Sequence, residues 1–238
     1  MAIKDGDFIK LSYSGSVGGT IFDTTDAEEA KSAGIHSPNA IYGPVTICVG
    51  QKHVIVGLDE EIAGKDAGTK GTVVVKPDKA FGERDPKRIQ SFPKNHFKEK
   101  PVRGMPVKVD EQGEGTVIDL IGSKVIVDFN PPLAGKTLTY AYTIEDFVTD
   151  PLEQLKGLVR LYAGRELEIA MDDTGKATIT LPPGLNYDRR WLLWRGRIIH
   201  EGFELIKGLS EITLVETFKR PEEKEEKKGK EQKDGKEE

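Results

Sequence analysis

Residues 8–15 read FIKLSYSG, and the fold expected for the first part of the chain starts from this stretch. Residues 3–13, which overlap it, predict a strand, because Ile3, Phe8, Leu11 and Tyr13 stand among polar neighbours. Gly18-Gly19 follows as a two-residue turn, and residues 20–23 predict a returning strand. The N-terminal segment is therefore expected to form a β-hairpin.

Several segments further along also have patterns of regular structure. Strands are expected at residues 45–49, 72–75 and 138–148, and a helix is expected at residues 54–63. Residues 24–43 hold glycine, proline, serine and asparagine and predict a loop. Many strands with one short helix indicate the α+β class for this part of the chain.

Short motifs along this region resemble the FKBP family in their order and spacing. The motifs are FIKLSYSG at 8–15, Phe22-Asp23, Val49-Gly50, VIVGL at 54–58 and PDKAFG at 77–82. The resemblance implies an antiparallel sheet that wraps a short helix. It also implies peptidyl-prolyl cis-trans isomerase activity (rotamase, EC 5.2.1.8).

About forty-five residues then separate the PDKAFG motif from DFNPPLAGK at 128–136. This arrangement is similar to the SlyD-like branch, in which a chaperone domain is inserted into the flap of the isomerase. The related closing motif has histidine where this chain has Pro131. The expected isomerase domain is therefore discontinuous, with residues 1–85 and 131–150 flanking an insert at 86–130.

The insert is expected to be a small β unit that captures unfolded polypeptide. Short strands are expected at 105–109, 116–120 and 124–129. Most of its apolar residues must form its own core, and by resemblance some form an exposed groove for unfolded chains containing X-Pro bonds. The candidates are Ile89, Phe92, Phe97, Val102, Met105, Ile118, Val125 and Phe129. Its lysines leave a nucleic-acid or ribosome-binding module as an alternative.

Residues 151–220 predict a second α+β domain in the order helix, strand, strand, helix, strand. Asp150 and Asp188 are suited to cap the two helices. This region resembles the extra domain of long archaeal FKBP-type chaperones. An apolar block there, Trp191, Leu192, Trp194 and Ile198, predicts a homodimer interface, with a plain domain core as the alternative. The charged segment 221–238 is expected to be disordered.

Composition limits the remaining functional classes. The formal net charge is −5, and no overall basic surplus points to a nucleic-acid partner. No apolar run reaches the roughly 18 residues needed to cross a membrane, and no signal-peptide core opens the chain. One cysteine fits a reducing compartment, so a soluble cytoplasmic protein is expected. The four histidines lack metal-ligand spacing, and neither a metal nor a cofactor is expected.

The expected chemistry needs only a shielded pocket. The barrier to rotation of an X-Pro bond, about 18–20 kcal/mol, comes from the double-bond character of the amide. Water stabilises the charge separation behind that character, so an apolar pocket makes rotation easier. A non-enzymatic holdase with the same fold is the competing reading.

The resemblance assigns the pocket residue by residue. Phe22 and Tyr140 would form walls, Leu58 the floor, and the Ile55 backbone N–H would bind the substrate carbonyl after proline. Asp23 would place a negative or accepting group near the twisting amide. The full set is Tyr13, Phe22, Asp23, Val45, Val54, Ile55, Leu58, Phe81 and Tyr140.

Overall fold

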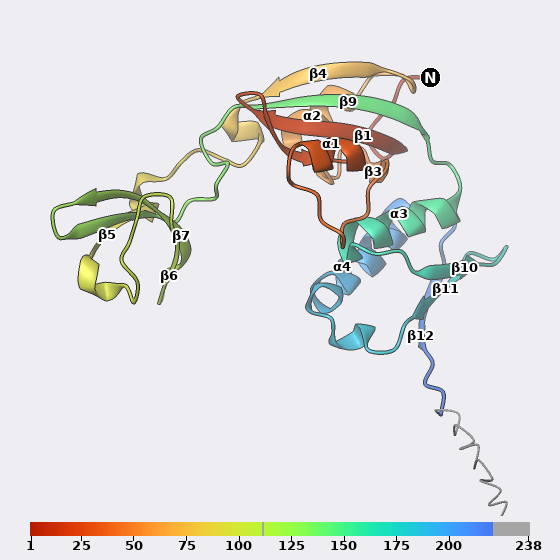
Figure 1. Ribbon diagram of the computed structural model, residues 1–238. Coiled ribbons are helices and arrows are strands. Elements are labelled where there is room, and N and C mark those ends of the chain that lie inside the picture. Colours follow the sequence, from red (N-terminus) through yellow and green to blue (C-terminus); the bar gives the residue numbers. More distant parts are fainter. Residues whose placement is uncertain (111, 221–238) are drawn as a thin grey trace, which may run out of the picture.

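The computed structural model describes residues 1–110 and 112–220, and it contains three separate β-sheets (Figure 1). Helices pack against two of these sheets, so the α+β class is confirmed. The predicted disordered segment 221–238 lies outside the described residues.

The first sheet is five-stranded and built around β1, which pairs along both edges. Its strands are β1 (Phe8–Val17), β2 (Thr20–Thr24), β3 (Val45–Cys48), β4 (Lys70–Val75) and β9 (Leu138–Phe147). The order is β2-β1-β9-β4, β3 pairs with the first half of β1, and every pairing is antiparallel. Gly18 and Gly19 form the predicted hairpin turn with φ of 56° and 84°, a region that favours glycine.

Two helices accompany this sheet, and the sequence predicted one of them. The expected helix is α2 (Val56–Ile62), which buries Leu58 and Ile62 completely against the sheet. The segment 24–43 was expected to be a loop but contains α1 (Ala27–Ser32). The Asp26 side chain caps α1 by accepting the Glu29 N–H at 2.8 Å, so the missed signal was this Asp-x-x-Glu spacing.

The insert forms the second sheet, and all of its strands are antiparallel. The strands are β5 (Ile89–Pro93), β6 (Pro106–Val109), β7 (Gly113–Ile121) and β8 (Lys124–Asp128), in the order β5-β8-β7-β6. The three predicted strands are present, whereas β5 was hidden by its terminal proline. Three short 3-10 helices lie in this part of the chain. η1 (Pro77–Lys79) precedes the insert, η2 (Pro86–Arg88) lies directly before β5, and η3 (Lys94–His96) lies directly after β5.

The two chain segments that enter and leave the insert are tied to each other (Figure 1). The Asp85 N–H donates to Asn130 Oδ1 at 2.9 Å, and Asn130 Nδ2 donates to the Asp85 carbonyl at 3.0 Å. Arg84 pairs with Asp128 beside this contact. The base of the insert is therefore closed, and its two ends are neighbours.

The third sheet belongs to the C-terminal region and carries two long helices. Its elements are α3 (Pro151–Ala163), β10 (Glu168–Met171), β11 (Lys176–Leu181), η4 (Leu185–Tyr187), α4 (Arg189–Leu205) and β12 (Glu211–Glu216). β11 pairs antiparallel with β10 and parallel with β12. Asp150 caps α3 through the Leu152 N–H, and Asp188 caps α4 through the Trp191 N–H, as predicted. The division of the chain into three domains at the expected boundaries stays a proposal.

The core of the C-terminal region contains two of the residues that were predicted to form a dimer interface. Trp191 and Ile198 are each 1 % exposed and pack with Leu155 and Leu158. Side chains buried to this extent cannot contact a second copy, so these two residues belong to the core. The same apolar cluster includes Phe8 of the first sheet, so the C-terminal region packs directly on that sheet.

Gly157 shows how close this packing is. A Cβ added at Gly157 on α3 would lie 2.5 Å from the Thr46 Cβ on β3. We expect Gly157→Ala to lower the free energy of unfolding by about 1–3 kcal/mol, because the two elements must separate. Gly196→Ala is the matched control: a Cβ there meets nothing within 4 Å, so the gain in helix propensity should stabilise by up to about 1 kcal/mol. Urea unfolding measures both, and equal effects would contradict this contact.

Among the residues that the structure describes, no helix has the length and apolar character to cross a membrane.

Candidate active site

A hollow of about 360 Å³ opens between the first sheet and α2. Its walls come from elements far apart in the sequence: β1, β2 and β9, the segment before α2, α2 itself, and the turn after η1. The lining residues are Tyr13, Asp23, Lys52, His53, Val54, Ile55, Leu58, Phe81 and Tyr140. All the predicted pocket residues except Phe22 and Val45 line this hollow.

Phe22 does not line the hollow but contacts Tyr140, which does. Its ring meets the Tyr140 ring edge-on, with centroids 5.9 Å apart, and the Tyr13 ring lies 5.8 Å from Tyr140 on another side. A Cβ added at Gly15 would lie 2.8 Å from Tyr140 and 2.9 Å from Phe22. Glycine at this point of β1 therefore leaves room for both rings, a role that the sequence analysis missed.

Val45 does not line this hollow, although it packs in the same apolar cluster as Tyr13 and Tyr140. It pairs with Leu11 of β1, two residues before Tyr13. It lines another hollow together with Arg160 and Leu161 of α3.

Two tyrosines surround the carboxylate of Asp23. The Tyr13 hydroxyl donates to Asp23 Oδ2 at 3.1 Å. Desolvation raises the pKa of Asp23 above its ordinary value of 3.8, although Tyr13 and the Thr24 N–H oppose that rise. Desolvation and the Asp23 charge raise the pKa of Tyr140 to about 12 and also raise that of Tyr13. At neutral pH both phenols are protonated donors beside one carboxylate.

The segment before α2 presents a backbone donor. Ile55 is the N-cap residue of α2 with φ −60° and ψ 146°, and its carbonyl accepts from Leu58 and Asp59. Within residues 1–110 and 112–220, its N–H makes no hydrogen bond. An N–H beside the hollow without a hydrogen-bond partner is free to bind a ligand carbonyl.

Lys52 and His53 also line the hollow, and the sequence analysis did not identify them. The His53 side chain is fully buried, and its Nδ1 accepts the Cys48 N–H at 3.0 Å. Its Nε2 lies 2.9 Å from Glu201 Oε2. No local pattern indicates this contact, because the partner is 148 positions away.

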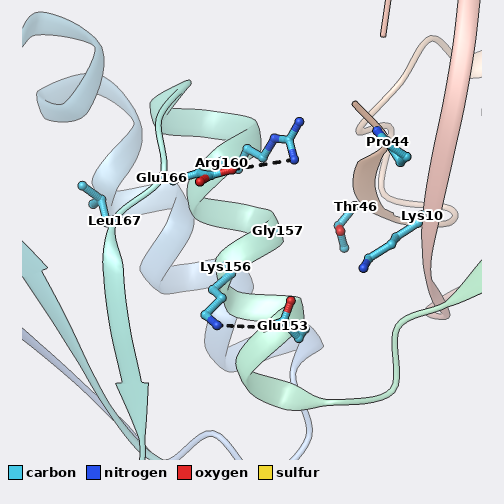
Figure 2. A pocket seen from close by; sticks show the side chains of 9 residues that line it. All are labelled: Lys10, Pro44, Thr46, Glu153, Lys156, Gly157, Arg160, Glu166 and Leu167. Atoms are coloured by element: carbon cyan, nitrogen blue, oxygen red, sulfur yellow. Dashed lines mark hydrogen bonds and ion pairs between the residues drawn. The ribbon is translucent and has the colours of Figure 1, made fainter. Parts of the chain in front are cut away.

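A second hollow, of about 450 Å³, lies between β3 and α3 (Figure 2). Two ion pairs lie along it: Lys156 contacts Glu153 at 2.8 Å, and Arg160 lies 4.0 Å from Glu166. Arg160 also donates to the Tyr42 carbonyl at 2.8 Å. No aromatic residue lines it, so it does not suit a prolyl ring.

The predicted insert residues divide between core and surface. Val125 is fully buried in the small core with Val117 and Val127, so it cannot contact a ligand. Val102 is 55 % exposed, and the remaining predicted residues are half-buried: Ile89, Phe92, Phe97, Met105, Ile118 and Phe129. Phe92 contacts both Phe97 and Phe129 edge-on, at centroid distances of 6.2 and 5.9 Å.

No cluster of three or more His, Cys, Asp or Glu side chains that could hold a metal is found in the described part of the chain.

Comparison with known proteins gives two family matches. Residues 1–99 match the profile of the FKBP-type peptidyl-prolyl cis-trans isomerases. Residues 151–219 match a profile described as FKBP26 C-terminal.

Individual relatives agree with the first match. A short-type peptidyl-prolyl cis-trans isomerase of Methanocaldococcus jannaschii is 34 % identical over 147 residues, which are 60 % of this chain and 93 % of the relative. An FKBP-type 16 kDa isomerase of Escherichia coli is 30 % identical over 54 % of this chain and 84 % of the relative. The isomerase SlyD of Helicobacter pylori is 28 % identical over 51 % of this chain and 69 % of the relative.

Proposed function

The chain belongs to the FKBP-type peptidyl-prolyl cis-trans isomerases, and we propose that it turns X-Pro bonds in the hollow between β1, β9 and α2. We propose further that the insert holds unfolded polypeptide beside this hollow and that the protein acts in the cytoplasm. The main support is a single arrangement: aromatic rings, a carboxylate and a free backbone N–H meet around one hollow.

In the proposed mechanism, the proline ring enters between Tyr140 and Leu58 and leaves water behind. Without water, the charge-separated form of the amide loses stabilisation, and rotation about the C–N bond becomes easier. The Ile55 N–H holds the carbonyl that follows proline, so that one side of the bond is fixed. Asp23 and the phenol of Tyr13 face the other side, where the carbonyl before proline turns. Each 1.4 kcal/mol removed from the barrier raises the rate about tenfold.

A peptide titration tests the location of the site. Adding a short X-Pro peptide to isotope-labelled protein should shift the backbone signals of Val54, Ile55 and Tyr140. Signals around Arg160 in the second hollow serve as the internal control and should not move. Shifts confined to Arg160 and its neighbours would contradict the proposed site.

The ionised carboxylate of Asp23 is expected to lower the stability of the fold and to support catalysis. Its pKa in the folded protein is raised above 3.8, so the folded state binds the proton more readily than the unfolded chain does. The ionised form therefore costs stability at pH 7, and that cost is lost as the pH falls toward 3.8. Asp23→Asn should raise the melting temperature at pH 7, with a gain that shrinks toward pH 4. The same variant should lower kcat/KM about tenfold, the effect of losing about 1.4 kcal/mol of transition-state stabilisation. A gain that grows in acid would contradict this account.

The chaperone part of the proposal rests on the composition of the insert sheet. Only three apolar side chains form its fully buried cluster, while several large ones, including Phe92, Phe97 and Met105, are half-buried against it. Val102 and Ile121 are 55 % and 60 % exposed. Such a surface favours sequence-tolerant contact with unfolded chains.

We still propose a homodimer through the C-terminal region, but its interface now excludes the buried residues Trp191 and Ile198. Leu192, Leu193 and Phe203 of α4 are 49 %, 67 % and 47 % exposed, and Leu192 and Phe203 lie on one face at an 11-residue spacing. Trp194 is 38 % exposed and stacks on Tyr162 at 5.4 Å.

Leu192→Asp should convert the dimer into a monomer, because it buries a charge in the contact. Sedimentation at micromolar concentration measures the change. Val74→Asp, at a side chain that is 65 % exposed on β4 of the first sheet, is the matched control for a new carboxylate. A wild-type chain that sediments only as a monomer would exclude the dimer.

A further inference from the structure

The segment between β3 and α2 supplies much of the hollow but has no regular structure of its own. Residues 52–55 all line the hollow, and Ile55 offers its free N–H there. Lys52 has a φ of 57°, a left-handed conformation that costs a non-glycine residue about 1–2 kcal/mol. A strained segment keeps one shape only if contacts around it hold that shape.

One set of contacts comes from the isomerase fold itself. Asp59 of α2 is 5 % exposed, and its two oxygens accept the N–H groups of Gly50 and Lys52, each at 3.0 Å. These bonds hold the first part of the segment. The Ile55 carbonyl is held separately by the N–H groups of Leu58 and Asp59. These bonds of α2 do not reach His53 or Val54.

The second anchor comes from the C-terminal region through His53. Because the Cys48 N–H donates to Nδ1, that nitrogen carries no proton, and Nε2 donates to Glu201 Oε2 at 2.9 Å. Glu201 is 6 % exposed and also accepts from Tyr162 at 2.8 Å and from Arg197 at 2.6 Å. The bond joins the fully buried imidazole of His53 to a carboxylate that Arg197 of α4 and Tyr162 of α3 hold in place.

Charges around the pair agree with this tautomer. Burial lowers the pKa of His53 below its ordinary value of 6.5, and the charge of Arg197 acts in the same direction. The carboxylates of Glu201 and Asp59 oppose that effect without reversing it. Burial alone would raise the pKa of Glu201, but hydrogen bonds from Arg197 and Tyr162 outweigh it, so Glu201 stays ionised. At neutral pH the contact is therefore neutral imidazole to carboxylate.

We propose that Glu201 is a positioning residue for the isomerase reaction, which through His53 holds residues 53–55 in the shape that receives the substrate. This inference rests on the hollow being the isomerase site. It makes the C-terminal region part of the catalytic apparatus, although no residue of that region lines the hollow.

Kinetics of the full chain on a short X-Pro peptide test the proposal. Glu201→Ala and His53→Ala should each lower kcat/KM about tenfold, since misplacement of a binding group by about 1 Å can cost up to a hundredfold. The double variant should lose no more than either single one, because Glu201 acts only through His53. Glu201→Gln keeps an acceptor of the same reach and should recover activity to within about threefold of the wild type.

Tyr162→Phe is the matched control. It removes another hydrogen bond to Glu201 but keeps the ring and leaves His53 bound, so it should lower stability and leave kcat/KM unchanged. Hydrogen exchange at the Cys48 amide, which donates to His53 Nδ1, should accelerate in Glu201→Ala and not in Tyr162→Phe. Both readouts are taken well below the melting temperature of each variant.

Several results would overturn the proposal. One is a folded Glu201→Ala with kcat/KM within twofold of the wild type; if that variant does not fold, His53→Ala decides in the same way. Losses that multiply in the double variant would also reject it. If Asp23→Ala and Tyr140→Ala leave activity intact, the hollow is not the site; if they abolish activity while the Glu201 and His53 variants do nothing, only the positioning role fails.

Discussion

Replacing residues 86–129 by a short glycine-serine loop is expected to leave catalysis on short X-Pro peptides within about twofold and to lower catalysis of proline-limited protein refolding about a hundredfold. The loss follows if the insert raises the local concentration of unfolded chain beside the hollow. The replacement is geometrically mild, because Asp85 and Asn130 are already hydrogen-bonded neighbours at the base of the insert.

A milder variant separates the insert surface from its fold. Val102→Ser and Ile121→Ser change two exposed side chains and should lower protein refolding severalfold without unfolding the sheet. Equal losses on peptides and proteins would show that the replacement damaged the hollow itself. Unchanged refolding of proteins would remove the chaperone role, and a salt-sensitive complex with RNA would favour the nucleic-acid alternative.

Tyr140→Ala is expected to lower kcat/KM on short peptides about a hundredfold, equal to about 2.7 kcal/mol of lost transition-state stabilisation. The ring is a wall of the hollow and is the contact surface for both Tyr13 and Phe22. Its removal opens the hollow to water, and water restores the amide resonance that the pocket weakens.

The control must allow for lost stability, because Tyr140 is 3 % exposed and truncating a buried aromatic ring costs about 3–5 kcal/mol. Tyr142 lies two residues further on β9, is 4 % exposed, and donates to Glu61 at 3.0 Å rather than lining the hollow. Tyr142→Ala should therefore destabilise similarly and leave kcat/KM within about threefold at a temperature where both variants are folded. Equal kinetic losses would mean that the effect comes from the fold. A folded Tyr140→Ala at wild-type activity would remove the pocket assignment.

Much of the fold could be predicted from the sequence at positions where neighbouring residues determine the structure. The Gly18-Gly19 turn needs positive φ, and the Asp150 and Asp188 caps satisfy helix N–H groups beside them. The errors have local causes as well: β5 ends in proline, and α1 is a short helix inside a segment rich in turn formers. Short elements carry few periodic positions, so their pattern is weak.

Part of the candidate site could also be predicted from the sequence. The motif residues that meet at the hollow come from β1, β2, β9 and α2, and their order along the chain identified most of them. Val45 packs in the same apolar cluster but does not line the hollow, a distinction that depends on the packing of the folded sheet. Trp191 and Ile198 were predicted to lie in an interface but lie in the core, because the sequence pattern of apolar side chains is the same in both places.

The sequence alone determined the isomerase family, the α+β class, the presence of an insert and most side chains of the hollow, because motif order and turn chemistry are properties of neighbouring residues. Only the tertiary structure decided which apolar side chains are core, that Phe22 meets Tyr140 edge-on, and that His53 meets Glu201. These contacts join residues far apart in the chain. They form only when packing and desolvation act on the folded molecule as a whole, so no local pattern can carry them.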